Sequence, residues 1–199
     1  MRKMLLLTVF AALAALLAGN AAADDLRGRL AVTGRIGVIN PANSERDANG
    51  ERLIVSTDAG FIGGGGFLFG IDEYIAMELD ITRSSFHTSN STGFGQAEMT
   101  NLSIGAQYRL PERQRFIPYF GAGMDVLIND LPNNSVNTVL GLHIASGLDY
   151  MLQRQVALNA EIKGIEAFSA DVKNFDGSKA GQFDPSHVSF TVGARFFFN

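Results

Sequence analysis

The amino-acid sequence predicts an all-β chain, an eight-stranded antiparallel up-and-down transmembrane β-barrel that follows a cleaved signal peptide. Three observations support this prediction. The N-terminus has the parts of a secretory signal, eight later segments alternate between apolar and polar residues, and short connections alternate with long ones between these segments. Strands of transmembrane barrels alternate in this way because one face meets lipid and the other meets the lumen.

Residues 1–23 have the features of a signal peptide. Arg2 and Lys3 form a positive start, an apolar run covers 4–17, and three alanines at 21–23 provide a small-residue cleavage site. The alternative, a membrane anchor, needs an apolar run of about 20 residues, and this one is shorter. The expected division is therefore a signal peptide at 1–23 and an outer-membrane β-barrel at 24–199.

The composition narrows the class of protein further. The chain has no cysteine, so disulfide-stapled folds and thiolate chemistry are excluded. Its formal net charge is −4, which disfavours nucleic acid as a partner. Hydrophobic residues make up 46% of the chain, and much of this content alternates with polar residues, as expected of a barrel wall.

The first two predicted strands are 26–39 and 59–69. The first carries Arg27, Arg29 and Arg35 on one face, and because a charge in hydrocarbon is costly, we expect these arginines to point into a lumen. The second contains four consecutive glycines at 63–66, and its faces stay unassigned. Glycines inside a strand mark bends, bulges or close approach of the backbone.

The next four strands are predicted at 73–83, 97–110, 116–128 and 136–151. The third strand alternates clearly, with apolar residues at 75, 77, 79 and 81 opposite Tyr74, Glu78 and Asp80. The same parity turns Tyr119 inward, and all four tyrosines fall near the ends that short turns join. We expect these tyrosines and nearby phenylalanines to form an aromatic girdle at one membrane interface.

The last two strands are predicted to start near 155 and to cover 187–198. The seventh strand loses its alternation at Glu166, and the eighth alternates to its end. Phe196 and Phe198 lie on the apolar face and are the candidate assembly signal, although Asn199 follows them. Such a closing strand needs a partner near the start of the barrel, because a sheet in lipid has no free edge.

The connections agree with this interpretation. Short turns follow the second, fourth and sixth strands, and longer polar loops follow the others, among them 40–58 and 169–186. The alternative is a soluble lipocalin-like barrel or sandwich, in which the apolar face would point inward. The signal peptide, the lack of cysteine and the aromatic last strand favour the membrane barrel.

Parity assigns a set of charged and polar side chains to the lumen. An eight-stranded barrel is just wide enough for side chains to fill it, so these groups are expected to pair into a plugged, salt-bridged core; a polar path for ions is the alternative. The expected lumen network consists of Arg27, Arg29, Arg35, Glu78, Asp80, Arg109, Asp125, His143, Asp149, Glu161, Lys163 and Arg195.

Neither a metal site nor a catalytic site is predicted. The histidines His87, His143 and His187 have no zinc-like spacing, and no cofactor is expected. His187 and Ser189 form a His-x-Ser pair like that of barrel enzymes that modify lipid A, but the pair shares the parity of the lumen face, whereas those enzymes act on the lipid side. The chain is therefore not expected to be an enzyme.

Several short motifs resemble a known family. They are Ala-Gln-Tyr at 106–108, Pro-Tyr-Phe-Gly-Ala-Gly at 118–123, Gly-Leu-Asp-Tyr-Met at 147–151, Leu-Asn at 158–159, Asp-Pro at 184–185 and Gly-Ala-Arg-Phe at 193–196. In order and spacing they resemble the outer-membrane protein W family of small eight-stranded barrels. The resemblance covers most of the chain after the signal and is strongest from Asn101 onward.

The resemblance implies a location in the bacterial outer membrane and a function. The function is a channel that admits small hydrophobic molecules and releases them sideways into the membrane. Implied partners are outer-membrane lipids and lipopolysaccharide, the barrel assembly machinery and small hydrophobic solutes. The alternatives are a non-transporting adhesion or envelope-integrity barrel and, less favoured, a lipid A-modifying enzyme. Candidate residues for a hydrophobic pocket and a lateral gap are Ile39, Phe61, Ile62, Gly64, Gly65 and Phe67.

Overall fold

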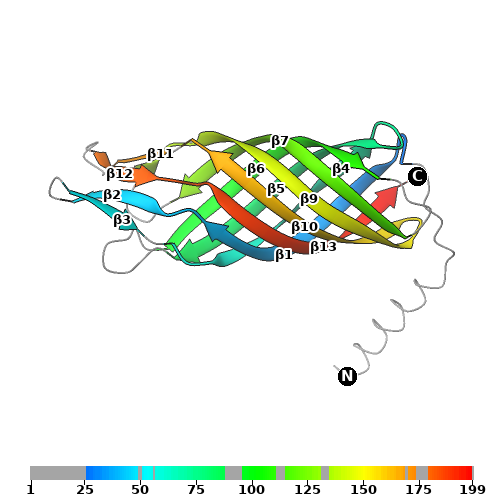
Figure 1. Cartoon of the computed structure of the whole chain (residues 1–199), viewed down its shortest axis with the longest axis horizontal. Coiled ribbons are helices and arrows are strands. Elements are labelled where there is room, and N and C mark those ends of the chain that lie inside the picture. Colours follow the sequence, from blue (N-terminus) through cyan, green and yellow to red (C-terminus); the bar gives the residue numbers. More distant parts are fainter. Residues whose placement is uncertain are drawn as a thin grey trace, which may run out of the picture.

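The computed structural model describes residues 26–48, 51–55, 57–87, 96–110, 115–130, 135–168, 170–173 and 179–198. Its main body is a closed antiparallel barrel of eight strands, as predicted (Figure 1). The predicted signal peptide lies outside the described residues. Within the described ranges, no helix has the length and apolar composition needed to span a membrane. The barrel strands are β1 (Leu30–Pro41), β4 (Gly60–Gly70), β5 (Ile75–His87), β6 (Gln96–Arg109), β7 (Phe116–Asp130), β9 (Val139–Gln153), β10 (Val156–Ala167) and β13 (His187–Phe198).

The barrel closes between its first and last strands. β1 pairs antiparallel with β13, from Leu30 opposite Phe198 to Pro41 opposite His187. The remaining strands pair in chain order around the barrel. The strands have 11 to 15 residues, more than the roughly 9–11 that cross a membrane core. The β1–β13 pairing leaves the barrel without an open edge. The longer strands can cross the hydrocarbon core of a membrane and extend beyond it.

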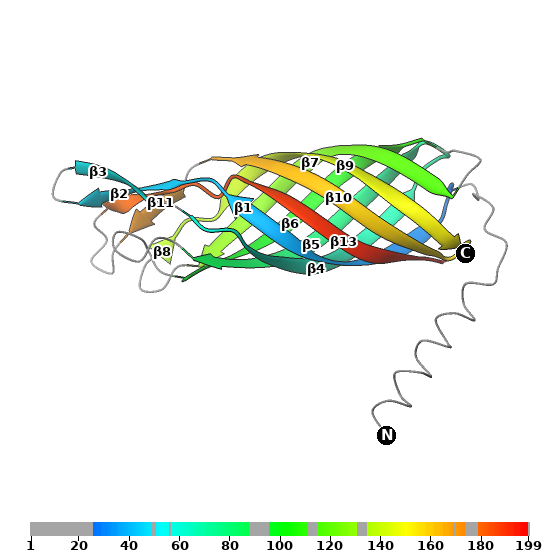
Figure 2. The same ribbon diagram turned by 60° about the horizontal axis from the view of Figure 1, so that its bottom comes forward.

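A second sheet extends the barrel at the end that carries the long connections (Figures 1 and 2). It consists of β2 (Ser44–Ala48), β3 (Glu51–Val55), β8 (Ser135–Val136), β11 (Ala170–Lys173) and β12 (Lys179–Phe183), in the order β3-β2-β12-β11-β8. The long polar loops predicted at 40–58 and 169–186 therefore contain strands in their described parts, which the sequence analysis did not predict. The backbone groups of these polar segments pair with segments distant in sequence, as Gly181 does with Arg46, which local alternation does not reveal.

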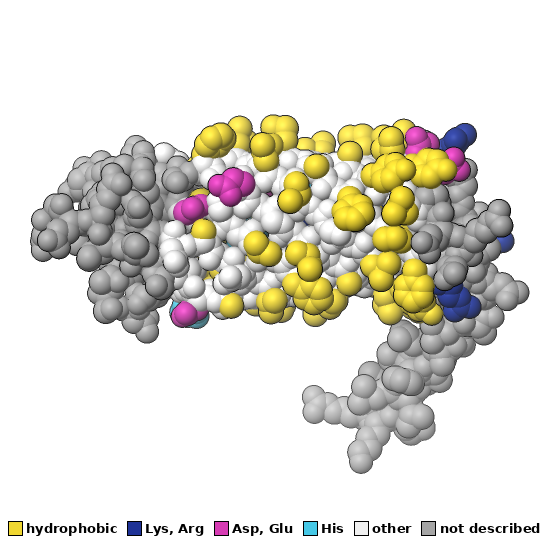
Figure 3. Space-filling model, in the orientation of Figure 1, with side chains coloured by type: hydrophobic (Ala, Val, Ile, Leu, Met, Phe, Trp, Pro, Cys, Tyr) yellow, Lys and Arg dark blue, Asp and Glu magenta, His cyan; other side chains and the backbone are white. Residues whose placement is uncertain are grey.

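The outer wall is apolar and the lumen is mostly polar. In β13 the even residues from Val188 to Phe198 are exposed, whereas Ser189, Thr191 and Arg195 are buried. Figure 3 shows hydrophobic side chains distributed over the visible wall. This arrangement is the reverse of a soluble barrel and agrees with a wall that faces lipid.

Aromatic side chains gather at the short-turn end. The rings of Tyr74 and Tyr108 stack with centroids 6.0 Å apart, and those of Phe116 and Tyr150 lie 4.8 Å apart. The expected inward direction of Tyr74 was wrong. Tyr74 is exposed because it belongs to the turn before β5, in which the Asp72 carboxylate accepts a hydrogen bond from the Tyr74 amide.

Candidate functional site

The lumen contains a charged layer between two apolar layers. We call the apolar layer at the long-connection end the upper cluster; it consists of Ile39, Ile62, Phe86, Ala97, Met99, Leu127 and Ile165. The lower cluster, at the short-turn end, consists of Leu26, Ala31, Leu68, Ala76, Ile117, Met151, Ala157 and Phe197. Between them lies the central network, which consists of Arg35, Glu78, Asp80, Arg109, Asp149, Glu161, Lys163 and Arg195.

Arg35 and Arg195 connect the carboxylates of the central network. The Arg35 guanidinium lies 2.7 Å from Glu161, 2.8 Å from Glu78 and 3.2 Å from Asp80. The Arg195 guanidinium lies 2.6 Å from the Asp149 carboxylate and 3.0 Å from that of Glu78. Six of the eight barrel strands contribute the residues of the central network, which meet because every second side chain of each strand points inward.

The remaining members complete the network. Arg109 donates to Asp149, which it shares with Arg195. Lys163 Nζ lies 3.5 Å from Asp80 Oδ2 and 3.7 Å from Glu161 Oε1. The Tyr119 hydroxyl donates to Glu161 Oε2 at 2.8 Å. The network has four basic and four acidic members, so its formal charges cancel, and a buried charge is tolerable only when it is paired in this way.

All but one member of the predicted lumen network are buried inside the barrel. The exception is Arg27, whose predicted inward direction was wrong. Arg27 is exposed because it lies in a turn before β1 begins at Leu30. Arg29 is buried at the lower end, where its guanidinium donates to the Arg154 carbonyl at 2.7 Å and lies 5.1 Å from the centroid of the Phe197 ring.

Asp125 and His143 form a separate polar pair beside the central network. His143 Nδ1 lies 2.6 Å from Asp125 Oδ2, and the Asn101 amide donates to Asp125 Oδ1 at 2.9 Å. Among the residues that the structure describes, no group of three or more His, Cys, Asp or Glu side chains is arranged to hold a metal ion. The buried Asp125 carboxylate is thus held by contacts with two neighbouring side chains.

The hydrophobic pocket predicted near the glycine run does not assemble. Ile39 and Ile62 are buried in the upper cluster, but Phe61 and Phe67 point outward, 58% and 52% exposed. Adjacent residues of a strand point to opposite faces, so Phe61 and Ile62 cannot line one pocket.

The wall is closed at the glycine run. β4 pairs with β1 and with β5 without a register shift through Gly64 and Gly65, so the lateral gap expected there is absent from the described wall. A Cβ atom added to Gly64 would overlap the backbone oxygen of Ile81, and one added to Gly65 would overlap that of Thr33. The glycines therefore permit close approach of neighbouring backbones.

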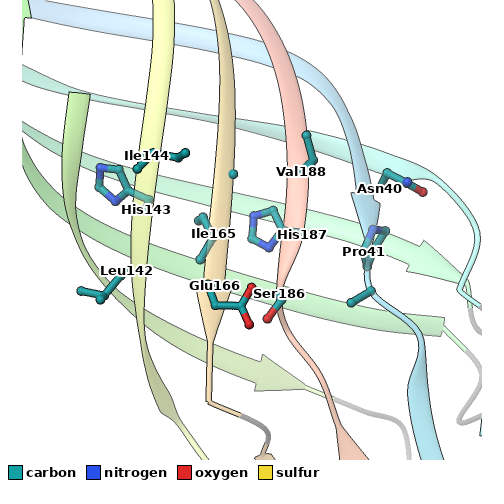
Figure 4. Close-up of a pocket in the computed structure, with 12 residues that line it drawn as sticks. Asn40, Pro41, Leu142, His143, Ile144, Ile165, Glu166, Ser186, His187 and Val188 are labelled. Atoms are coloured by element: carbon teal, nitrogen blue, oxygen red, sulfur yellow. The ribbon is translucent and has the colours of Figure 1, made fainter. Parts of the chain in front are cut away.

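A hollow of about 570 Å³ lies elsewhere in the wall, at the upper ends of β1, β9, β10 and β13 (Figure 4). Gly164 lies in it, and a Cβ atom added there would meet nothing within 4 Å. Exposed Leu142, Ile144 and Val188 flank it on the lipid side. Sequence reasoning missed this hollow, although the outward position of Gly164, between Ile162 and Glu166, was a usable signal.

The hollow reaches the side chains of the lumen. Ile165 and His187 line it, and both are buried on the lumen side, where the two residues are register partners on β10 and β13. Figure 4 shows Ile165 between His143 and His187. Ile165 also belongs to the upper cluster. The hollow and the upper cluster are therefore separated by very few side chains.

A side chain closes the seam above the hollow. The β10–β13 ladder ends at the pair Ile165 and His187. Beyond it, the Ser186 hydroxyl accepts from the Ala167 amide at 3.0 Å and lies 3.4 Å from the Ala167 carbonyl oxygen. A hydroxyl thus takes the place of backbone pairing at this point of the seam.

The His-x-Ser pair makes contacts with the backbone. His187 Nδ1 lies 2.8 Å from the Pro185 carbonyl oxygen, and the Ser189 hydroxyl lies 3.5 Å from the Lys163 carbonyl oxygen. Both side chains are buried on the lumen side, as parity predicted. The arrangement lacks the direct bond between nucleophile and base that hydrolytic sites require.

Comparisons with known proteins agree with the architecture. The family model described as "Outer membrane protein beta-barrel domain" matches residues 8–196. The solved structure of the outer membrane protein OprG from Pseudomonas aeruginosa is 16% identical, covers 87% of this chain and 97% of its own, and gives a TM-score of 0.70. Neisserial surface protein A is 14% identical, with coverages of 88% and 99% and a TM-score of 0.59. AlkL, solved in lipid bilayers, is 18% identical, with coverages of 87% and 91% and a TM-score of 0.59. These likenesses show the fold. The search of curated proteins found no match.

Proposed function

Given that the chain belongs to the outer membrane protein beta-barrel domain family and lies in the bacterial outer membrane, we propose that it is a channel for small hydrophobic molecules. Solutes enter from outside and leave sideways through the wall. The resemblance to the outer-membrane protein W family is confirmed to the extent of this broader family and its eight-stranded fold. In such barrels the short turns face the periplasm, so the upper cluster lies toward the cell exterior.

The central network supports a sideways route. Its paired charges and the lower cluster fill the lumen below the upper cluster, so an apolar solute that travelled along the axis would have to displace buried ion pairs. The upper cluster is apolar instead; its side chains are 0–4% exposed, so a solute enters this layer by parting them and then contacts hydrocarbon rather than paired charges. Transfer from this layer into the lipid hydrocarbon is favourable for an apolar solute, because it stays out of water there.

One observation carries the proposed exit. Ile165 belongs to the upper cluster and also lines the hollow in the lipid-facing wall. A solute held by the upper cluster is therefore one side chain away from the outside of the barrel. The seam held by the Ser186 hydroxyl lies directly above this point and can part at the cost of a side-chain hydrogen bond.

The test compares the entry rates of two dyes into vesicles whose outer leaflet is lipopolysaccharide and whose bilayer contains the refolded barrel. N-Phenyl-1-naphthylamine is the apolar solute, and its sulfonated analogue is the polar one of similar size. The proposal expects the barrel to accelerate entry of the apolar dye alone. Equal rates with and without folded barrel, with folding checked by heat-dependent gel mobility, would contradict it.

Two glycine variants locate the exit. Gly164→Leu fills the hollow without a clash, because a Cβ there meets nothing within 4 Å, and it is expected to slow the apolar dye about fivefold or more. Gly34→Leu is the matched control, since Gly34 is equally open, faces lipid on β1 and lies outside the hollow. Equal uptake by both variants would place the exit elsewhere.

The second candidate function is a non-transporting surface barrel for adhesion or envelope integrity. The five-stranded sheet favours it, because this sheet extends the barrel beyond the membrane and presents an ordered surface (Figure 2). Replacing 44–55 by a short turn would then abolish cell binding while uptake of the apolar dye stays unchanged. Loss of uptake with intact cell binding would exclude this alternative.

The remaining expectations about partners and chemistry are also proposals. The apolar wall contacts outer-membrane lipids and lipopolysaccharide, and outward Phe196 and Phe198 offer the assembly machinery an aromatic signal. We propose no enzymatic activity, because His187 and Ser189 contact backbone carbonyls and face the lumen. A lipid product that disappears in His187→Ala would contradict this.

A further inference from the structure

A small void marks the boundary between the upper cluster and the central network. Ile62 and Ile165 of the upper cluster lie on its lining, and Arg35, Glu161 and Lys163 of the central network lie there too. Its other lining residues are polar: Thr82, Asn101, His187, Ser189 and Thr191. The void is about large enough for one water-sized group. An apolar solute in the upper cluster can therefore extend one small polar group into it.

The charges around the void disfavour an ionised group. The Arg35 guanidinium contacts three carboxylates, and Glu161 accepts from both Arg35 and Tyr119. Because the central network is already balanced, a carboxylate or an ammonium group added here would be a buried charge without a counter-charge. Burying an unpaired charge costs several kcal/mol, of the order of 3–5 when one partner is missing.

The hydrogen-bonding capacity left at the void suits a neutral group that both donates and accepts. Lys163 Nζ lies 3.5 and 3.7 Å from its carboxylate neighbours, longer than the roughly 2.7–2.9 Å of a charge-assisted hydrogen bond, so the ammonium can still donate. Asn101 presents an acceptor: its amide nitrogen is held by Asp125, and its buried Oδ1 has no hydrogen-bond partner among the described residues.

We infer that the solute class is amphipathic alcohols, with the hydrocarbon part in the upper cluster and a terminal hydroxyl in the void. A hydroxyl accepts from Lys163 and donates to Asn101 Oδ1, whereas a hydrocarbon does neither and a carboxylate adds a charge. This inference rests on the proposed channel function and adds the chemical class that its binding site selects.

The experiment measures binding of three solutes of equal chain length, octane, 1-octanol and octanoate at pH 8. The barrel in lipid nanodiscs carries labelled isoleucine methyl groups, with Ile62 and Ile165 assigned by Ile→Val substitution. The solute concentration is expressed as mole fraction in the bilayer, which removes differences in partitioning. Octanol is expected to shift both methyl signals and to bind with about fivefold higher affinity than octane, which corresponds to the free energy of one net hydrogen bond. Octanoate is expected to bind more weakly than octanol by about tenfold or more, because its charge would be buried without a partner.

Two variants test whether the void is responsible. Asn101→Leu removes the acceptor at similar size and is expected to lower the preference for octanol over octane, because only the hydrogen bond from Lys163 remains. Ser103→Ala is the matched control on the same strand, since Ser103 is also buried in the lumen but does not line the void. The void variant Asn101→Ala, which also removes the acceptor, provides a second measurement should Asn101→Leu fail to fold.

The outcomes separate this inference from the channel function. If the wild-type barrel accelerates the apolar dye but octanol binds no better than octane, the channel stands and the alcohol class is wrong. The alcohol class is also wrong if the preference for octanol is unchanged in both void variants. If the dye is not accelerated and no solute shifts the two methyl signals, the proposed function itself fails.

Discussion

Replacing Arg195 by methionine tests whether the central network stabilises the barrel through balanced charge. The Arg195 guanidinium is fully buried and lies 2.6 Å from Asp149 and 3.0 Å from Glu78, and it also donates to the Thr33 hydroxyl at 2.9 Å. Methionine retains much of the side-chain volume and removes the charge. The described central network would then have three basic and four acidic members.

The structure allows a rough magnitude. Removing one partner of a buried ion pair costs about 3–5 kcal/mol, because the other charge stays buried without its partner. With a urea m value of about 2 kcal/mol/M, the unfolding midpoint would fall by roughly 2 M. Adding Glu78→Gln restores the balance, and Arg35 keeps Asp80 and Glu161 as partners. The double variant is therefore expected to be more stable than Arg195→Met by about 1 kcal/mol or more.

Urea unfolding of the barrel in phospholipid vesicles provides the assay. The chain has no tryptophan, so the folded fraction is read from tyrosine fluorescence and heat-dependent gel mobility. Arg83→Met is the control, because Arg83 pairs with Glu98 on the outside, is 70% exposed and should lose less than about 1 kcal/mol. A loss below about 1 kcal/mol for Arg195→Met, or a double variant less stable than the single one, would refute the reasoning.

Two further predictions concern the wall and the lower cluster. Gly64→Val should fail to assemble, because its Cβ would overlap the Ile81 backbone, whereas Gly63→Ala should fold, since the nearest atom to its added Cβ lies 3.5 Å away; equal yields of gel-shifted barrel would contradict this. Phe197→Ala should destabilise the barrel by about 3–5 kcal/mol through a buried cavity, and Phe198→Ala by less than half as much because lipid fills the space; urea midpoints in the wrong order would disprove it.

Much of the fold followed from alternation with a period of two. The predicted last strand at 187–198 has the same bounds as β13, and its inward and outward residues were assigned correctly. The alternation is strong because each strand separates lipid from a filled lumen, so a one-residue slip would expose Arg195 to hydrocarbon. The same parity brought the members of the central network to one side of every strand that contributes to it.

The predictions that were wrong have physical causes. The four glycines at 63–66 have no side chains to show which face they occupy, and Phe61 and Phe67 were assigned to the pocket although parity sends them to lipid. Arg27 was misplaced because periodicity does not show where a turn ends and a strand begins. The second sheet depends on pairings between distant segments, such as that of Gly181 with Arg46, and no local pattern reports these.

The pairing of Leu30 with Phe198 has a consequence for the kinetics of folding. β1 cannot pair with β13 until almost the whole chain has been synthesised. This pairing has the largest sequence separation in the barrel and is therefore expected to form last. Until then, β1 and β13 present unpaired edges that invite aggregation. Arg195 likewise reaches Thr33, 162 residues away, only after closure. Ring closure therefore also completes the buried contacts of Arg195, and the two are expected to form together late in folding.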